Sequence, residues 1–171
     1  MNIFVGCSSR EEIAKDYLDL ATEVGDRLKG VHFIIGGSLH GMMGSVVKHI
    51  PKPDITQIIL KDYVNEGESY SSSYQICETS FERMEHIWNA TDIFLILPGG
   101  TGTLGEIITF LEENRMKKEK KKIIVFNYQG FYDDIIAFVE KTKEKKFCND
   151  DILAGLSFAN CLDEVVELMK G

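Results

Sequence analysis

The sequence predicts one α/β domain that spans residues 1–171 and contains a doubly wound, mostly parallel sheet. Short apolar runs alternate along the chain with longer stretches whose apolar residues recur every three or four positions. Such alternation is typical of units in which a helix connects two parallel strands. We find no internal repeat and no linker, and 171 residues are enough to bury one sizeable core.

The individual elements follow from the same periodicity. Buried strands of a parallel sheet are continuous apolar runs, whereas amphipathic helices bury one face. Strands are predicted at residues 1–5, 31–35, 55–60, 92–97 and 123–127. Helices are predicted at residues 11–28, 45–49, 77–89, 107–113, 135–143 and 163–169, with a short connector at residues 152–158.

Composition narrows the classes of function. Hydrophobic residues make up 44% of the chain and charged residues 27%, as in soluble globular proteins. The formal net charge of −8 argues against a nucleic acid or an anionic membrane as the main partner, because both carry negative charge. The chain opens without the features of a signal peptide, and no apolar stretch approaches the roughly 18 residues of a membrane span. We therefore expect a cytoplasmic protein that does not bind membranes.

The four cysteines lie far apart in the sequence and form neither a C-x-x-C pair nor a zinc-ligand spacing. They are Cys7, Cys77, Cys148 and Cys161. We interpret them as reduced thiols and expect neither a bound metal nor a cofactor.

The strongest signal is a glycine-rich turn between the predicted strand at residues 92–97 and the helix that follows. Such a turn exposes backbone N–H groups, lets an anion approach where Cβ atoms are absent, and adds the positive end of the helix dipole. Threonine hydroxyls in the turn can cap the helix or donate to a phosphate oxygen. The predicted phosphate-binding residues are Gly99, Gly100, Thr101, Gly102 and Thr103.

Glu106 is predicted to lie in the first turn of this helix, beside the phosphate, and two interpretations fit that position. Thr103 and Glu106 have the T-x-x-E spacing of a capping box, in which the acid completes the helix N-terminus. Alternatively, the carboxylate stabilises an oxocarbenium-like state or acts as an acid or base on a sugar phosphate. The two roles are compatible, because a cap also fixes the carboxylate in place.

Two further strand-to-helix junctions, at residues 6–10 and 36–44, are rich in small residues. Loops in this position lie at the carboxyl ends of strands, where doubly wound sheets bind ligands. Residues 6–10 also fit an ordinary tight turn, and His40 fits a structural or exposed histidine. The longest predicted loop, residues 61–74, is either a lid or a surface loop. Its tyrosines Tyr63, Tyr70 and Tyr74 are candidates for stacking on a base.

Residues 98–106 read P-G-G-T-G-T-L-G-E, which resembles the P-G-G-x-G-T-x-x-E motif of the LONELY GUY (LOG) family of cytokinin riboside 5′-monophosphate phosphoribohydrolases. The likeness covers most of the chain. Residues 36–44 are similar to the family's glycine-rich loop, and Ser8 lies in a similar serine-bearing first turn. Arg83 falls where the family has an arginine, and residues 130–133 look like the family's G-F-Y-D element.

The resemblance implies a Rossmann-like homodimer that hydrolyses the N-glycosidic bond of a purine or cytokinin-type nucleoside 5′-monophosphate. The products would be the free base and ribose 5-phosphate. Arg83 and Glu106 would form the catalytic pair, and Ser8, Gly37 and Met43 would join the glycine-rich turn in binding the nucleotide. The helix around Arg83 would contribute apolar residues to the twofold interface, unless they belong to the core: Phe81, Met84, Ile87 and Trp88.

Met84 departs from the family pattern, because a lysine follows the arginine there. A non-catalytic nucleotide-binding sensor or carrier of the same fold is therefore the alternative to a hydrolase. A lysine decarboxylase is disfavoured, because that chemistry needs a Schiff-base lysine in a pyridoxal phosphate pocket, and the sequence has no lysine in a recognisable cofactor loop.

Overall fold

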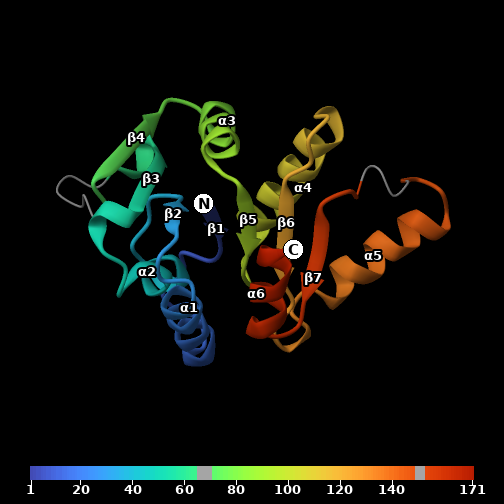
Figure 1. The fold of residues 1–171 in the computed structure, drawn as a ribbon, viewed down its shortest axis with the longest axis horizontal. Helices are drawn as coiled ribbons and strands as arrows, with labels where there is room; N and C mark the ends of the chain where they lie inside the picture. The colour runs from blue at the N-terminus through green and yellow to red at the C-terminus, as the bar shows by residue number, and fades with distance from the viewer. Residues whose placement is uncertain (65–70, 149–152) are drawn as a thin grey trace.

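A computed structural model describes residues 1–64, 71–148 and 153–171. Within these residues a seven-stranded parallel sheet has the order β4-β3-β2-β1-β5-β6-β7 (Figure 1). The strands are β1 (Asn2–Gly6), β2 (His32–Ile35), β3 (Ile55–Leu60), β4 (Ser73–Cys77), β5 (Ile93–Ile96), β6 (Lys122–Phe126) and β7 (Leu156–Ala159). The α-helices are α1 (Lys15–Arg27), α2 (Gly41–Val47), α3 (Ser80–Ala90), α4 (Thr101–Met116), α5 (Asp133–Glu144) and α6 (Leu162–Lys170). The prediction of a parallel α/β sheet is confirmed.

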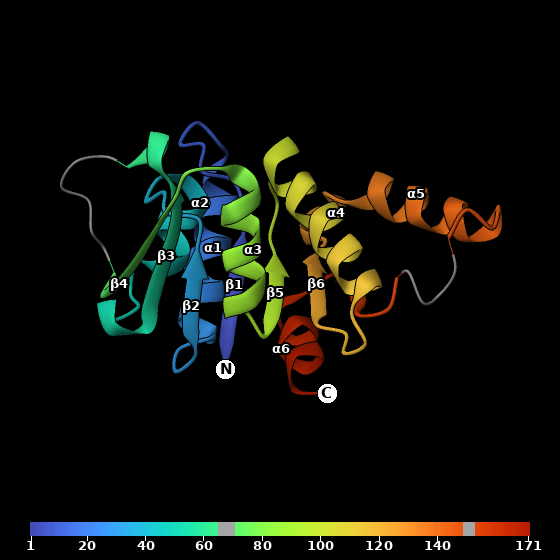
Figure 2. The same cartoon turned by 90° about the horizontal axis from the view of Figure 1, so that it is seen from above.

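Helices cover both faces of the sheet, as a doubly wound fold requires (Figure 2). One face buries residues of α1, α2 and α6, including Val24, Val46 and Val165. The other face buries residues of α3 and α4, including Trp88 and Phe110. Helix α5 has no buried residue and projects from the body of the molecule.

The strand order reverses at β1, which pairs with β2 on one side and with β5 on the other. Ligand sites of doubly wound sheets lie at the carboxyl ends of the strands at such a switch. Here the N–H of Leu97 donates to the carbonyl of Gly6 at 2.8 Å, and the N–H of Ser8 donates to the carbonyl of Pro98 at 3.2 Å. The N–H of Met42 donates to the carbonyl of Ser8 at 3.0 Å, so backbone bonds fix the loops around the switch.

Both outer strands differ from the sequence prediction. Residues Ser73–Cys77 form β4, where the sequence predicts the end of a loop and the first residue of a helix, and Leu156–Ala159 form β7 rather than a connector. In the part of the chain that the structure describes, each of these strands pairs with one neighbour only and leaves most of its residues partly or fully exposed. A search for continuous apolar runs therefore misses them, because such runs mark strands that are buried on both faces.

Helix α3 begins at Ser80, three residues later than predicted, because Thr79 caps it. The Thr79 hydroxyl accepts the N–H of Glu82 at 3.1 Å, and the Glu82 carboxylate accepts the N–H of Glu78 at 2.8 Å. These two bonds resemble a capping box, and they place Arg83 at the end of the first helical turn.

The predicted long loop is only partly covered by the structure. Lys61–Tyr63 form a 3-10 turn of the predicted long loop, whereas residues 65–70, with Tyr70, lie outside the described residues.

Helix α1 begins at Lys15 rather than at residue 11, because Ala14 has an extended backbone. In the described parts of the chain, every helix is too short or too polar to cross a membrane.

Candidate functional site

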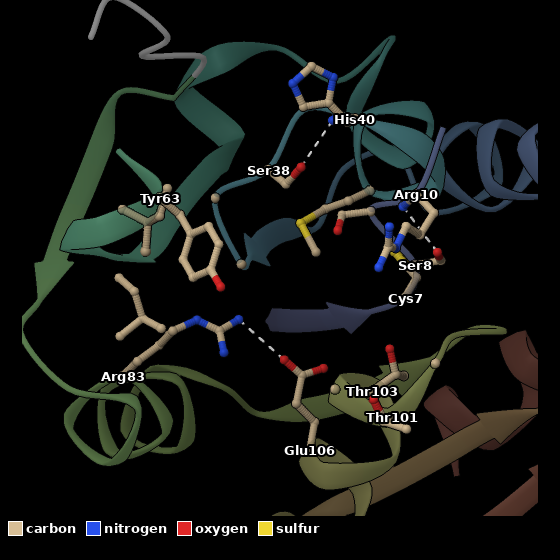
Figure 3. A pocket seen from close by; sticks show the side chains of 18 of the residues that line it. Cys7, Ser8, Arg10, Ser38, His40, Tyr63, Arg83, Thr101, Thr103 and Glu106 are labelled. Carbon is tan, nitrogen blue, oxygen red and sulfur yellow. Dashed lines mark hydrogen bonds and ion pairs between the residues drawn. The ribbon is translucent and has the colours of Figure 1, made fainter. Parts of the chain in front are cut away.

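A cavity of about 700 Å³ opens at the carboxyl ends of the central strands. Its walls come from the loops that follow β1, β2 and β3, from α3 and from the start of α4 (Figure 3). The volume is within the range of small-molecule sites, and the position is the switch point of the sheet.

One wall of the cavity is the beginning of α4, with Gly100, Thr101, Gly102 and Thr103. Gly100 is the N-cap residue, and no described side chain caps this end of the helix. The first N–H groups of a helix have no carbonyl partner within the helix, and the helix dipole adds positive potential there. This wall is therefore suited to an anion such as a phosphate.

Gly99 lies behind this wall rather than among the residues that line the cavity. A Cβ atom at Gly99 would lie 2.2 Å from the hydroxyl oxygen of Thr103, so the glycine makes room for the buried threonine. Because Gly100 is the N-cap, Thr103 is the third residue of the helix and Glu106 lies in its second turn. The capping-box interpretation of Glu106 is therefore wrong.

Arg83 and Glu106, which are far apart in the sequence, form an ion pair at the inner end of the cavity (Figure 3). The Arg83 Nη2 atom lies 3.2 Å from Glu106 Oε1, and the two side chains are only 15% and 13% exposed. The Arg83 Nε–H also donates to the carbonyl of Ile58 at 3.2 Å. The guanidinium is therefore held by β3 and by α4 at the same time.

Two glycines make space for this ion pair. A Cβ atom at Gly6 would lie 2.7 Å from Oε2 of Glu106, and one at Gly36 would lie 2.6 Å from Nη2 of Arg83. These glycines stand at or just after the ends of β1 and β2. The carboxyl edge of the sheet is therefore shaped to admit the two charged groups.

Burial dominates the electrostatics of the site. It raises the pKa of Glu106, and the charge and hydrogen bond of Arg83 oppose that rise. Burial also raises the pKa of the Cys7 thiol, with a smaller contribution from Glu106, and it raises the pKa of Tyr132 well above its usual value. Cys7 and Tyr132 are therefore neutral at physiological pH, whereas Arg83 supplies a fixed positive charge.

The remaining predicted binding residues, Ser8, Gly37 and Met43, all line the cavity. Gly37 has a φ of 101°, a backbone conformation that favours glycine, and its carbonyl accepts the side-chain amide of Gln57 at 3.1 Å. His40 also lines the cavity and forms a 2.7 Å ion pair with the exposed Glu11 if it is protonated.

Sequence reasoning did not single out Arg10, Asp62 or Tyr132 as site residues. Arg10 and Asp62 line the cavity, and Arg10 brings a second cation to it. The Tyr132 hydroxyl donates to the carbonyl of Leu97 at 2.8 Å and so supports the end of β5 from behind. Arg10 follows the predicted Gly-Ser turn, but a single arginine in a turn carries no pattern that marks it.

Tyr63 and Tyr74, predicted as stacking residues, both line the cavity. Met84 is not among the residues that line it, and its sulfur lies 3.9 Å from Nη1 of Arg83. The apolar side chains of α3 were predicted to belong either to a twofold interface or to the core, and they do not all lie in the same environment. Ile87 and Trp88 are buried in the core, whereas Phe81 is 86% exposed.

The fold and the cavity together define a doubly wound α/β protein in which a helix N-terminus suited to an anion lies beside a buried arginine–glutamate pair. The sequence model of the family described as "Possible lysine decarboxylase", which includes the LOG proteins, matches residues 25–169. The chain belongs to this family, and the resemblance inferred from the motif is confirmed.

Curated plant proteins are similar along most of the chain. A probable cytokinin riboside 5′-monophosphate phosphoribohydrolase from Oryza sativa subsp. japonica is 27% identical over 98% of this chain and 70% of its own length. A cytokinin riboside 5′-monophosphate phosphoribohydrolase from the same organism is 28% identical over 87% of this chain and 64% of its own length. One from Arabidopsis thaliana is 26% identical over 85% of this chain and 70% of its own length.

Solved structures share the fold at lower sequence identity. The Moco carrier protein from Chlamydomonas reinhardtii superposes with a TM-score of 0.68 at 15% identity, over 99% of this chain and 94% of that one. The molybdenum cofactor binding protein from Rippkaea orientalis has a TM-score of 0.70 at 18% identity, over the same shares of the two chains. These similarities establish the architecture.

Gly36 leaves space for the Arg83 guanidinium, and this leads to a testable expectation for the variant Gly36→Ala. The added Cβ pushes the guanidinium away from Glu106, and because Arg83 lowers the pKa of that carboxyl, the pKa should rise further. Carbon-detected NMR titration of Glu106 measures it. The free energy of unfolding should fall at neutral pH, because a buried carboxylate whose native pKa rises further is less well compensated by Arg83.

Gly105→Ala is the matched control, since a Cβ there meets open space. It should leave the Glu106 pKa unchanged. An unchanged pKa in Gly36→Ala as well would show that the glycine does not hold the ion pair in place.

Proposed function

We propose that the protein is a hydrolase that cleaves the N-glycosidic bond of a nucleoside 5′-monophosphate and releases the free base and ribose 5-phosphate. The observation that carries the proposal is the buried Glu106 carboxylate, paired with Arg83 just beyond an anion-binding helix N-terminus. The names of the curated plant relatives support this substrate class and favour a purine or cytokinin-type base.

The spacing along α4 fits a ribose 5-phosphate. From Thr103 to Glu106 the helix advances three residues, which is about 4.5 Å along its axis. A 5′-phosphate on the first-turn amides therefore places the ribose beside the Glu106 carboxylate. Ser8 and Arg10 lie near the same end of the cavity and add a hydroxyl and a positive charge for the phosphate (Figure 3).

Glu106 carries the chemistry in this proposal. Cleavage of the bond between C1′ and the base nitrogen develops positive charge on the ribose, and an ionised carboxylate at short range stabilises that charge. The same carboxylate accepts a proton from the water that adds to C1′, while the base leaves and takes up a proton. Arg83 keeps Glu106 ionised and oriented, and its remaining N–H groups are donors for a ribose hydroxyl.

The base occupies the opposite side of the cavity. Tyr63 and Tyr74 offer ring faces for stacking, and Ile59 offers apolar contact. Binding energy from the phosphate and the base is then available to hold the ribose against Glu106, where the bond breaks.

A lysine decarboxylase activity has no support from the cavity, despite the description of the family model. None of the described residues that line the cavity is a lysine. A Schiff base with pyridoxal phosphate therefore has no amine there to form on.

The replacement Glu106→Gln tests the hydrolase proposal. We expect purified wild-type protein to release base from at least one of AMP, GMP, CMP, UMP and isopentenyladenosine monophosphate, measured by chromatography. Glu106→Gln should lower kcat by about 10²–10⁴-fold with little change in melting temperature, because it removes a charge but keeps the shape. The exposed Glu112 lies on the same helix, so Glu112→Gln should behave like the wild type.

The alternative is a non-catalytic nucleotide sensor or carrier, and Met84 in place of the family lysine favours it. In that case a nucleotide raises the melting temperature but is recovered intact after long incubation. Release of base after such a shift would exclude the carrier. A folded protein that binds nucleotide and releases no base from any of the five would exclude the hydrolase.

The raised pKa of Glu106 predicts the pH dependence of the reaction. Because the ionised form is required, kcat/KM should fall as the pH drops through a value above 4.5, the ordinary pKa of a glutamate. Stability changes in the opposite sense: the native state binds this proton more tightly than the unfolded state, so Glu106 contributes less stability as the pH rises through its raised pKa. A pH–rate profile with an acid limb below 4.5 would contradict the assignment.

We also propose a homodimer that uses the exposed side of α3 and α4. Phe81 is 86% exposed and Ile108 is 51% exposed, and both belong to the helices on one face of the sheet. A second copy of the chain would cover them. Light scattering at micromolar concentration should give twice the chain mass, and Phe81→Asp should lower it toward one chain; a monomeric wild type would count against the dimer.

A further inference from the structure

We propose that Cys77, Glu82 and His86 form a binding site for a divalent transition metal of the Zn²⁺ type. A sulfur, a carboxylate oxygen and an imidazole nitrogen from these residues all lie within 4.8 Å of one another. Cys77 ends β4, and Glu82 and His86 lie on α3, so the site connects the outermost strand to the helix that carries Arg83. None of the three lines the cavity described above, so the inference does not depend on the proposed function.

The geometry is close to that of a bound metal. Glu82 and His86 are four residues apart and share one face of α3, with Oε1 of Glu82 3.8 Å from Nε2 of His86. Bonds of 2.0–2.3 Å in a tetrahedral zinc site place ligand atoms about 3.5 Å apart. The carboxylate and the imidazole already lie near that separation, and the cluster needs to contract by little more than about 1 Å to close around an ion.

The carboxylate is already oriented from behind. Oε2 of Glu82 accepts the N–H of Glu78 at 2.8 Å, which leaves Oε1 on the side of His86. Metal-binding side chains characteristically have such a second contact, which fixes the ligand before the ion arrives. The cap that starts α3 therefore also orients one ligand.

Cys77 gives the cluster its chemical character. Its side chain is fully buried, and no described residue forms a hydrogen bond with its sulfur. One thiol, one imidazole and one carboxylate form a donor set that suits Zn²⁺, whereas Mg²⁺ and Ca²⁺ prefer oxygen ligands alone. His86 and Glu82 are 43% and 39% exposed, so an ion can enter from their side and keep water as a fourth ligand.

Neighbouring charges permit a cation at this position. Arg83 is next in sequence to Glu82, but its guanidinium contacts the carbonyl of Ile58 and the carboxylate of Glu106. When a metal binds, the thiol proton is released to solvent, and Cys77 and Glu82 together then carry two negative charges. A divalent ion is then matched in charge by its own ligands.

The experiment uses Co²⁺ as a spectroscopic probe on the full chain after treatment with a chelator. We expect one equivalent of Co²⁺ to produce a thiolate-to-cobalt charge-transfer band that Zn²⁺ abolishes by displacement. Cys77→Ser and His86→Ala should each remove the band, whereas Cys161→Ser and His49→Ala, which change exposed residues elsewhere, should keep it. Zn²⁺ should raise the melting temperature of the wild type but not of His86→Ala.

The absence of a charge-transfer band from the wild type would overturn the proposal, as would a band that persists in Cys77→Ser. His86 is partly exposed, so His86→Ala tests the site even if Cys77→Ser fails to fold. The readout does not use base release, so failure of the metal site and failure of the hydrolase proposal are distinguished by separate measurements.

Discussion

The buried ion pair between Arg83 and Glu106 is the constraint on which the rest of the site depends. Removing two charges from water is costly unless both find partners, and the raised pKa of Glu106 shows that burial outweighs the help of Arg83 there. The backbone supplies what the pair needs: the carbonyl of Ile58 accepts from the guanidinium, and glycines at positions 6 and 36 give both groups room. A pair held in this way is ready to act on a ligand without rearranging first.

The central part of the fold could be predicted from the sequence because burial on both faces leaves a plain pattern. The strand around residues 93–96 is an uninterrupted apolar run, and it lies in the middle of the sheet. Strands β4 and β7 left no such pattern, because edge strands keep one side in contact with solvent. The start of α3 was misplaced although Thr79 and Glu82 have the T-x-x-E spacing of a capping box, because the periodicity of apolar residues alone does not mark where a helix begins.

The residues of the site also divide into those that a local sequence pattern can predict and those that depend on residues distant in the sequence. The glycine-rich turn could be predicted as a candidate phosphate site because its residues are consecutive. Arg83 was predicted by resemblance alone, since no local pattern links it to Glu106. Arg10 and Tyr132 were missed, because no local pattern marks a single arginine in a turn and the Tyr132 hydroxyl contacts the carbonyl of Leu97, which is distant in the sequence. The proposed metal site escaped any search by spacing, because its ligands come from a strand end and a helix face.

The place of the cavity has one more consequence for the molecule. Within the sheet the two halves are hydrogen-bonded to each other where β1 pairs with β5, and the cavity lies across this seam. Gly36 and Arg83 belong to one half, whereas Thr101 and Glu106 belong to the other. An occupant that contacts both sides therefore adds to the ion pair and the β1–β5 pairing that already join the two halves, and part of its binding free energy becomes cohesion between them.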